Sequence, residues 1–133
     1  MDRPVDDMLK QAIGITDTDL GKLSSGLKLV LGSVGRCRLV AEVTESKYCL
    51  HGLKVGDKFV IDGGILNTRD STAPFCMGAL APIDPLNLIS MNRLASGLMP
   101  DGSVIGYAHC HDFGVDHGGL GEVYFRVHTE ATG

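Results

Sequence analysis

The spacing of apolar residues changes near residue 35, and this change limits the fold more than any other feature of the sequence. Before it, apolar residues recur every three or four positions, which is the spacing of one helix face. From Cys37 to Val43, an apolar residue falls at every second position, which is typical of a strand with one buried face. A chain that contains both patterns predicts an α+β fold.

Two helices are expected ahead of this strand. The first covers about residues 4–13 and ends at Gly14. The second starts near residue 17 and carries an apolar stripe formed by Leu20, Leu23, Leu27, Val30 and Leu31. Gly21 and Gly26 fall inside it, and each costs about 1 kcal/mol relative to Ala. This helix is therefore expected to pack closely against a neighbour.

The remainder of the chain predicts further strands around a helical middle segment. Strands are expected at residues 57–62, 103–111 and 122–130. The middle segment, residues 71–97, predicts two short helices, because Pro82 is expected to end the first of them.

The predicted fold class is α+β, with a small antiparallel or mixed sheet of about four strands, a helical middle segment and two N-terminal helices. We expect a single domain over residues 1–133, made of a helical N-terminal extension (1–34) and a cysteine-containing α+β core (36–128). A chain of this length can bury a core without disulfide bonds.

Composition and charge argue against several classes of partner. The formal net charge is −4, basic residues are not clustered, and 5% of residues are aromatic with no Trp, so nucleic acid is not an expected partner. No stretch approaches the roughly 18 to 20 apolar residues of a membrane span. The N-terminus lacks the pattern of a secretory signal, so the expected location is the cytoplasm, where cysteines are reduced thiols or metal ligands.

Thiols and imidazoles are the side chains best suited to a functional site. Cys49 precedes a turn, Cys76 lies near the start of a helix, and Cys110 is flanked by His109 and His111. These five side chains suit Zn²⁺ or an iron–sulfur cluster. Cys76 is alternatively a nucleophile with a nearby histidine as base, because a helix start favours the thiolate. Motifs such as C-x-x-C are absent, so spacing does not decide between ligands, a nucleophile and inert core thiols.

The remaining candidates keep more than one interpretation. Cys37 alternates with apolar strand residues and is interpreted as core. Asp112 and Asp116 are either ordinary loop residues or groups that orient a ligand imidazole. Whether His51 and His117 contribute to a site stays open in the same way.

Two further polar positions have structural interpretations. Lys54 and Asp57 are expected to serve a turn in which Asp57 accepts a hydrogen bond from nearby backbone. His128, near the C-terminus, is expected to point outward into solvent.

Three blocks of the sequence together carry a resemblance to other proteins. In chain order they are C-L-H-G-L-K-V-G-D-K-F (49–59), F-C-M-G-A-L (75–80), and A-H-C-H-D leading to E-V-Y-F-R-V (within 108–127). They resemble a family of small, functionally uncharacterised bacterial and archaeal proteins. Its pattern is C-x-x-G-x-K-x-G-D-x-F, then a C-P-x-A helix start, then a late cysteine before the last strand. Met77 replaces the usual proline. The resemblance covers about residues 36–128 and implies that Cys49, Cys76 and Cys110 form one set, without naming a reaction.

Two functions are favoured nearly equally. One is a small accessory subunit of a larger cytoplasmic enzyme system, and the other is a metal-binding protein that uses Cys49, Cys76 and Cys110. The expected partner is a larger enzyme subunit or a second copy, and the N-terminal helices with their apolar stripes suit such packing. The alternative is a stand-alone enzyme with Cys76 as nucleophile, so the sequence leaves open whether the protein is an enzyme.

Overall fold

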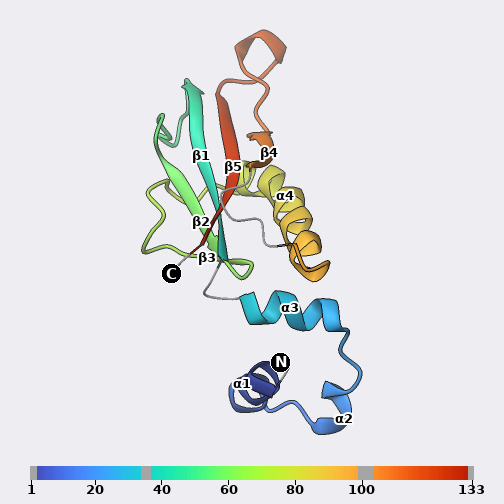
Figure 1. Cartoon of the computed structure of the whole chain (residues 1–133). Coiled ribbons are helices and arrows are strands. Elements are labelled where there is room, and N and C mark those ends of the chain that lie inside the picture. The colour runs from blue at the N-terminus through green and yellow to red at the C-terminus, as the bar shows by residue number, and fades with distance from the viewer. Residues whose placement is uncertain (1–2, 34–36, 99–103, 132–133) are drawn as a thin grey trace.

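The computed structural model describes residues 3–33, 37–98 and 104–131. It has four α-helices, α1 (Arg3–Ile13), α2 (Asp17–Leu20), α3 (Ser25–Ser33) and α4 (Met77–Ala95), and a short 3-10 helix at Val115–His117 (Figure 1). The strands are β1 (Cys37–Lys47), β2 (Lys58–Asp62), β3 (Ile65–Leu66), β4 (Val104–His109) and β5 (Glu122–Ala131). The α+β fold class is confirmed.

The described strands form one sheet in the order β3-β2-β1-β5-β4, and every neighbouring pair is antiparallel. The sheet has five strands rather than about four, because the chain folds back after β2 and adds the two-residue β3. Gly63 and Gly64 form this turn with φ values of 57° and 84°, a left-handed conformation that glycine adopts without steric cost.

One face of the sheet packs against α4 and forms the core. Phe59 and Phe125 are fully buried there, with ring centroids 5.9 Å apart, and Ile83 of α4 is fully buried in the same cluster. The inward-facing residues of β1 and β5 are buried as the alternation predicts: Leu39, Ala41, Val43, Val123, Phe125 and Val127. Val40, which the alternation places on the other face of β1, is also buried, so the expectation of a single buried face was wrong at this position.

The second N-terminal helix is divided into α2 and α3, so the expectation of one continuous helix was wrong. The hydroxyl of Ser24 accepts the backbone N–H of Leu27 at 3.0 Å, which starts a new helix instead of continuing the old one. The expected close packing is confirmed at Gly26, where a Cβ would lie 2.9 Å from the carbonyl oxygen of Ala95 in α4.

The helical middle segment is the single helix α4, so the expectation that Pro82 ends a helix was wrong. Pro82 and Pro85 both lie inside α4. A proline within a helix has no N–H to donate, so the carbonyl four residues earlier loses its helical partner. For Pro82 this carbonyl belongs to Gly78, and it accepts the backbone N–H of His111 from outside the helix.

The helices α1, α2 and α3 form an arm that extends beyond one end of the sheet (Figure 1). α3 contacts α4, and α1 contacts α3. Leu9 and Leu20 are buried within the described structure, and an ion pair of 3.1 Å joins Lys28 of α3 to Asp6 of α1. The arm is thus attached to the body through α3.

The two edges of the sheet differ. After β3, the segment 67–73 stays bonded to β2: the N–H of Asn67 donates to the Val60 carbonyl, and the Val60 N–H donates to the Ser71 hydroxyl at 2.8 Å. Beside β4, no described residue forms a backbone hydrogen bond with the outward-facing edge. The edge strand on one side is therefore the two-residue β3, and on the other side it is the longer β4.

Candidate functional site

Three of the four cysteines lie at one end of the sheet, beside the N-terminus of α4. Cys49 follows β1, Cys76 directly precedes α4, and Cys110 follows β4. Each is half-buried and packs against the same core cluster. Cys37 lies at the other end of β1, away from these three cysteines, which agrees with the expectation that it is not one of the candidate site residues.

β4 ends at His109, and the side chain of this residue turns away from the thiols. The His109 ring packs against the rings of Phe113 and Tyr124, with centroid distances of 6.1 and 5.9 Å. The next residue, Cys110, packs instead against the core on the α4 side of the sheet. The expected condition for a joint site, that the strand ends here, is met, but His109 and Cys110 still face opposite sides.

His111 lies against the first turn of α4. Its backbone N–H donates to the Gly78 carbonyl at 3.0 Å. A Cβ on Gly78 would lie 3.9 Å from the Cβ of His111 and 4.0 Å from the sulfur of Cys76. Cys76 and His111 therefore flank Gly78.

The carboxylate of Asp112 organises the loop between β4 and β5. One oxygen accepts the backbone N–H groups of Gly114 and Leu120, at 3.1 and 2.7 Å, and the other accepts that of Gly121 at 2.7 Å. These hydrogen bonds, with that of Gly121 the strongest, lower the pKa of Asp112 below its ordinary value of 3.8. Asp112 thus holds the loop in place.

The same loop reaches the turn that carries Cys49. A Cβ on Gly121 would lie 3.2 Å from the Tyr48 carbonyl oxygen and 3.4 Å from the Cα of Cys49, so only glycine allows this approach without a shift. Tyr48 itself has a φ of 58°, an uncommon value for a tyrosine. The loop therefore connects the segments of Cys49 and Cys110.

The remaining loop candidates are exposed. His51, Asp116 and His117 all lie at the surface of loops or of the short 3-10 helix. Nothing in the described contacts joins them to the three thiols.

No group of three or more His, Cys, Asp or Glu side chains within the described ranges is arranged to hold a metal ion. All five predicted ligands, Cys49, Cys76, Cys110, His109 and His111, lie in these ranges. Their donor types suit zinc, but the side chains are not drawn together into a ligand set.

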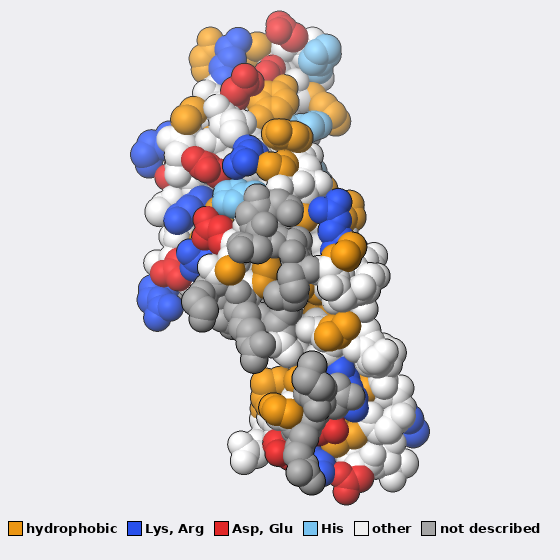
Figure 2. All heavy atoms as spheres, viewed as in Figure 1, with side chains coloured by type: hydrophobic (Ala, Val, Ile, Leu, Met, Phe, Trp, Pro, Cys, Tyr) orange, Lys and Arg blue, Asp and Glu red, His pale blue; other side chains and the backbone are white. Residues whose placement is uncertain are grey.

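An open groove of about 710 Å³ runs between the first half of α4 and β4. Pro82, Pro85 and Leu86 form one wall, and the residues from Tyr107 to His111, with Phe113, form the other. The lining contains thiol and imidazole groups but no carboxylate, ammonium or guanidinium group. In the view of Figure 2, the upper end of the molecule shows apolar side chains and histidines together with Lys, Arg, Asp and Glu side chains. Sequence reasoning missed the α4 wall, because prolines and leucines carry no recognisable motif.

The turn at Lys54 and Asp57 is confirmed. Asp57 is 5% exposed, and its carboxylate accepts the Lys54 backbone N–H at 3.1 Å and the Thr72 hydroxyl at 3.2 Å. Burial acts to raise the pKa of Asp57, but the hydrogen bonds from Lys54 and Thr72 outweigh it, so the pKa lies below 3.8. The motif G-D in this stretch is therefore structural.

A charged network covers the outer face of the sheet. Arg38 donates to Asp70 and to Glu130, each at 3.2 Å, and Glu130 is 3.2 Å from the ring nitrogen of His128. Burial acts to raise the pKa of Glu130, but the bonds from His128 and Arg38 lower it below its ordinary value of 4.5. The side chain of His128 is 15% exposed, so the expectation that it is solvated was wrong.

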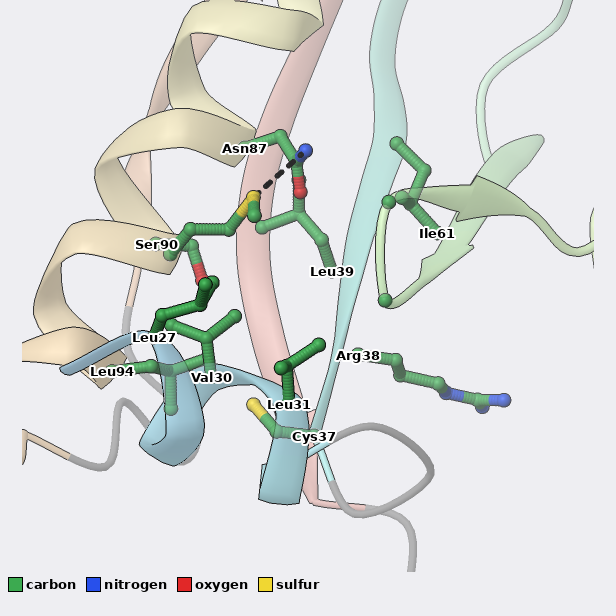
Figure 3. Close-up of a pocket in the computed structure, with 13 residues that line it drawn as sticks. Leu27, Val30, Leu31, Cys37, Arg38, Leu39, Ile61, Asn87, Ser90 and Leu94 are labelled. Atoms are coloured by element: carbon green, nitrogen blue, oxygen red, sulfur yellow. Dashed lines mark hydrogen bonds between the residues drawn. The ribbon is translucent and has the colours of Figure 1, made fainter. Parts of the chain in front are cut away.

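A cavity of about 110 Å³ lies where the arm meets the body (Figure 3). Leu27, Val30 and Leu31 of α3 line it, together with Leu94 of α4 and Cys37 of β1. In the close-up, the sulfur of Cys37 points toward Leu31. The contact between arm and body is therefore apolar and incompletely filled.

The molecule exposes more surface than its mass requires. Its accessible surface is 8018 Å², whereas a compact monomer of 14.1 kDa is expected to expose about 6,700 Å², which leaves an excess of about 1,300 Å². The described helices include none that is long and apolar enough to cross a membrane.

Comparison of the chain with known protein families, with curated proteins and with solved structures finds no match in any of the three.

Proposed function

We propose that the protein is an accessory component that binds a larger protein through the apolar surface of its helical arm. The observation that carries this proposal is the exposure of large apolar side chains on α1 and α3. Ile13 is 69% exposed and Leu29 is 51% exposed, and Met8 and Leu27 are each about two-fifths exposed. Apolar side chains on a projecting element are typical of a surface that another protein covers.

The covered and uncovered parts of α1 support this proposal. Val5, Met8, Leu9, Ala12 and Ile13 are the apolar residues of its predicted face. Leu9 is buried and Val5 is half-buried, but the other three are exposed. The apolar face of α1 is thus wider than the part that α3 covers, so a second surface is left for a partner.

Charged residues hold the arm together. Lys10 forms an ion pair of 2.6 Å with Asp17, and Lys28 forms one with Asp6. The arm thus carries polar groups on the same helices as its exposed apolar side chains, and protein–protein interfaces combine the two kinds of residue. The partner surface is therefore expected to be an apolar groove or helix face.

The test is cross-linking in an extract of the source cells, followed by mass spectrometry, with variants that place a charge on the arm. Ile13→Lys and Leu29→Lys are expected to lose a cross-linked partner that the wild-type chain retains. Gln11→Lys and Thr18→Lys are matched controls, because both residues are exposed and polar on the same arm. A partner that all four variants retain, or the absence of any partner, contradicts the proposal.

A second candidate function is the binding of a thiophilic metal ion. The observation that favours it is the contact of Cys49, Cys76 and Cys110 with one core cluster at one end of the sheet. Thiolates bind zinc strongly, and binding would require these side chains to move together into a ligand set. The residues named here form the candidate ligand set, with His111 adjacent to Cys76.

Zinc titration of the reduced protein, with a count of reactive thiols, tests this second candidate. Binding of one zinc ion per chain is expected to protect three thiols, and Cys49→Ala, Cys76→Ala and Cys110→Ala are each expected to weaken it. Cys37→Ala is the matched control, because Cys37 lies at the other end of β1. Four unprotected thiols at saturating zinc contradict it.

A further inference from the structure

The outer edge of β4 is open, and its sequence is suited to pairing. The strand reads V-I-G-Y-A-H and contains no Lys, Arg, Asp or Glu. Sheet proteins usually protect an open edge with charged residues, proline or a bulge, or keep the edge strand very short, as β3 is at the opposite edge here. The register of β4 with β5 shifts between Val104 and Gly106, so the regular part of the edge, residues 106–109, is the template for another strand.

The side of α4 next to β4 adds an apolar stripe to this edge. Pro82, Pro85 and Ile89 recur at the spacing of one helix face, and Ile89 is 41% exposed. On the strand, Tyr107 is 73% exposed. The groove between stripe and strand is lined by no charged carboxylate, ammonium or guanidinium group.

A second copy of the chain matches both features at once. A strand that suits the β4 edge must be extended, uncharged and open along one side, and β4 itself has these properties. A twofold axis perpendicular to the sheet would pair β4 antiparallel with β4 and would bring the two α4 stripes together on the same face. β4 carries no charged side chain, so no like charges meet along the paired strands. On α4, the apolar stripe ends at Arg93.

The exposed area is sufficient for such an interface. A standard stable interface buries about 800 Å² on each partner. The chain as a whole exposes about 1,300 Å² more than a compact monomer, which is larger than that value, and the projecting arm accounts for part of this excess.

We propose that two copies of the chain associate through β4 and form one continuous antiparallel sheet, to which each copy contributes five strands. The adjacent α4 helices pack against each other across the twofold axis. This dimer leaves the arm uncovered, so it is independent of the binding function proposed above.

The test uses the full-length chain and compares two substitutions at equally exposed strand positions. Tyr107 of β4 and Ile65 of β3 are each 73% exposed, so a lysine at either is tolerated by the fold, which circular dichroism verifies. Analytical ultracentrifugation over a range of concentrations is expected to give a dimer for the wild type and for Ile65→Lys. Tyr107→Lys is expected to weaken dimerisation at least about tenfold, because each dimer would carry two lysines at the pairing edge.

Amide hydrogen exchange identifies the surface that is used. Protection that increases with protein concentration is expected in residues 104–109. A chain that stays monomeric at the highest concentration overturns the proposal. A dimer that Tyr107→Lys leaves intact, or one that protects α1 and α3 instead of β4, also overturns it. If the wild-type chain is monomeric but Ile13→Lys still removes its cross-link to a larger protein, the dimer proposal fails and the arm function stands. The failures of the two proposals are therefore distinguishable.

Discussion

The backbone carbonyl of Gly78 accepts the backbone N–H of His111 at 3.0 Å, and this bond exists because Pro82 has no N–H to offer that carbonyl. An isolated proline in a helix normally leaves a carbonyl to water. Here the loop after β4 supplies the missing donor. The proline inside α4 thereby fixes the position of His111 relative to Cys76.

Pro82→Ala is expected to loosen this loop while it strengthens the helix. The alanine N–H competes for the Gly78 carbonyl, so the amide of His111 should exchange with solvent faster than in the wild type. Pro85→Ala is the matched control. The carbonyl that lacks a helical partner because of Pro85 is that of Ala81, an exposed residue, and the N–H of His111 donates to Gly78 instead. Equal exchange rates at His111 in the two variants would contradict this role of Pro82.

Asp112→Asn is expected to release the loop between β4 and β5. An amide has one oxygen in place of two, so at least one of the bonds from Gly114, Leu120 and Gly121 is lost. We expect faster proteolysis in this loop and faster reaction of Cys49 and Cys110 with a thiol reagent. Asp116→Asn, at an exposed loop acid, should change neither rate.

Much of the sheet could be predicted from the sequence, and the reasons are local. The alternation from Cys37 to Val43 and from Val123 to Val127 follows directly from which side chains face the core. The α4 error arose because the partner of the Gly78 carbonyl, His111, lies more than thirty residues away, and no local pattern reveals it. The α2–α3 break was decided by a single serine cap within an otherwise helical stripe.

The candidate site was predictable only as a set of residue types. The segments of Cys49, Cys76 and Cys110 pack against one core cluster at one end of the sheet, a placement that no local sequence pattern shows. The separation of His109 from Cys110 depends on where β4 ends, and the role of Asp112 depends on backbone donors in a folded loop. Such roles can be recognised only when the path of the folded chain is known.

Acid should remove part of the stability that Asp57 provides. Its pKa is lowered on folding, so its contribution is complete above the unfolded value near 3.8 and is lost as pH falls through the folded value. We expect Asp57→Asn to cost about 1 kcal/mol of unfolding free energy at pH 7, measured with urea, because a buried acceptor loses charge. Below about pH 4 the difference from wild type should shrink, and a constant difference across this range would contradict the assignment.

Gly26→Ala should weaken the attachment of the arm. A Cβ there meets the Ala95 carbonyl oxygen at 2.9 Å, so α3 must move away from α4, at a cost of about 1 to 3 kcal/mol. Gly21→Ala is the control, because Gly21 has a helical φ of −65° and its nearest contact for a Cβ is 3.5 Å. That control should be neutral or more stable in urea, by up to about 1 kcal/mol.

The segment 67–73 that follows β3 and is bonded to β2 has a consequence for how this protein can assemble. A sheet with two open edges can add strands from both sides and grow into a fibre. Here the edge strand on the far side, β3, has only two residues, and the backbone that follows it is bonded to β2, so little of that edge can pair with another strand. Once a strand is added at β4, the outer edges of the enlarged sheet are the two short β3 strands, so growth by strand addition is disfavoured after a single step.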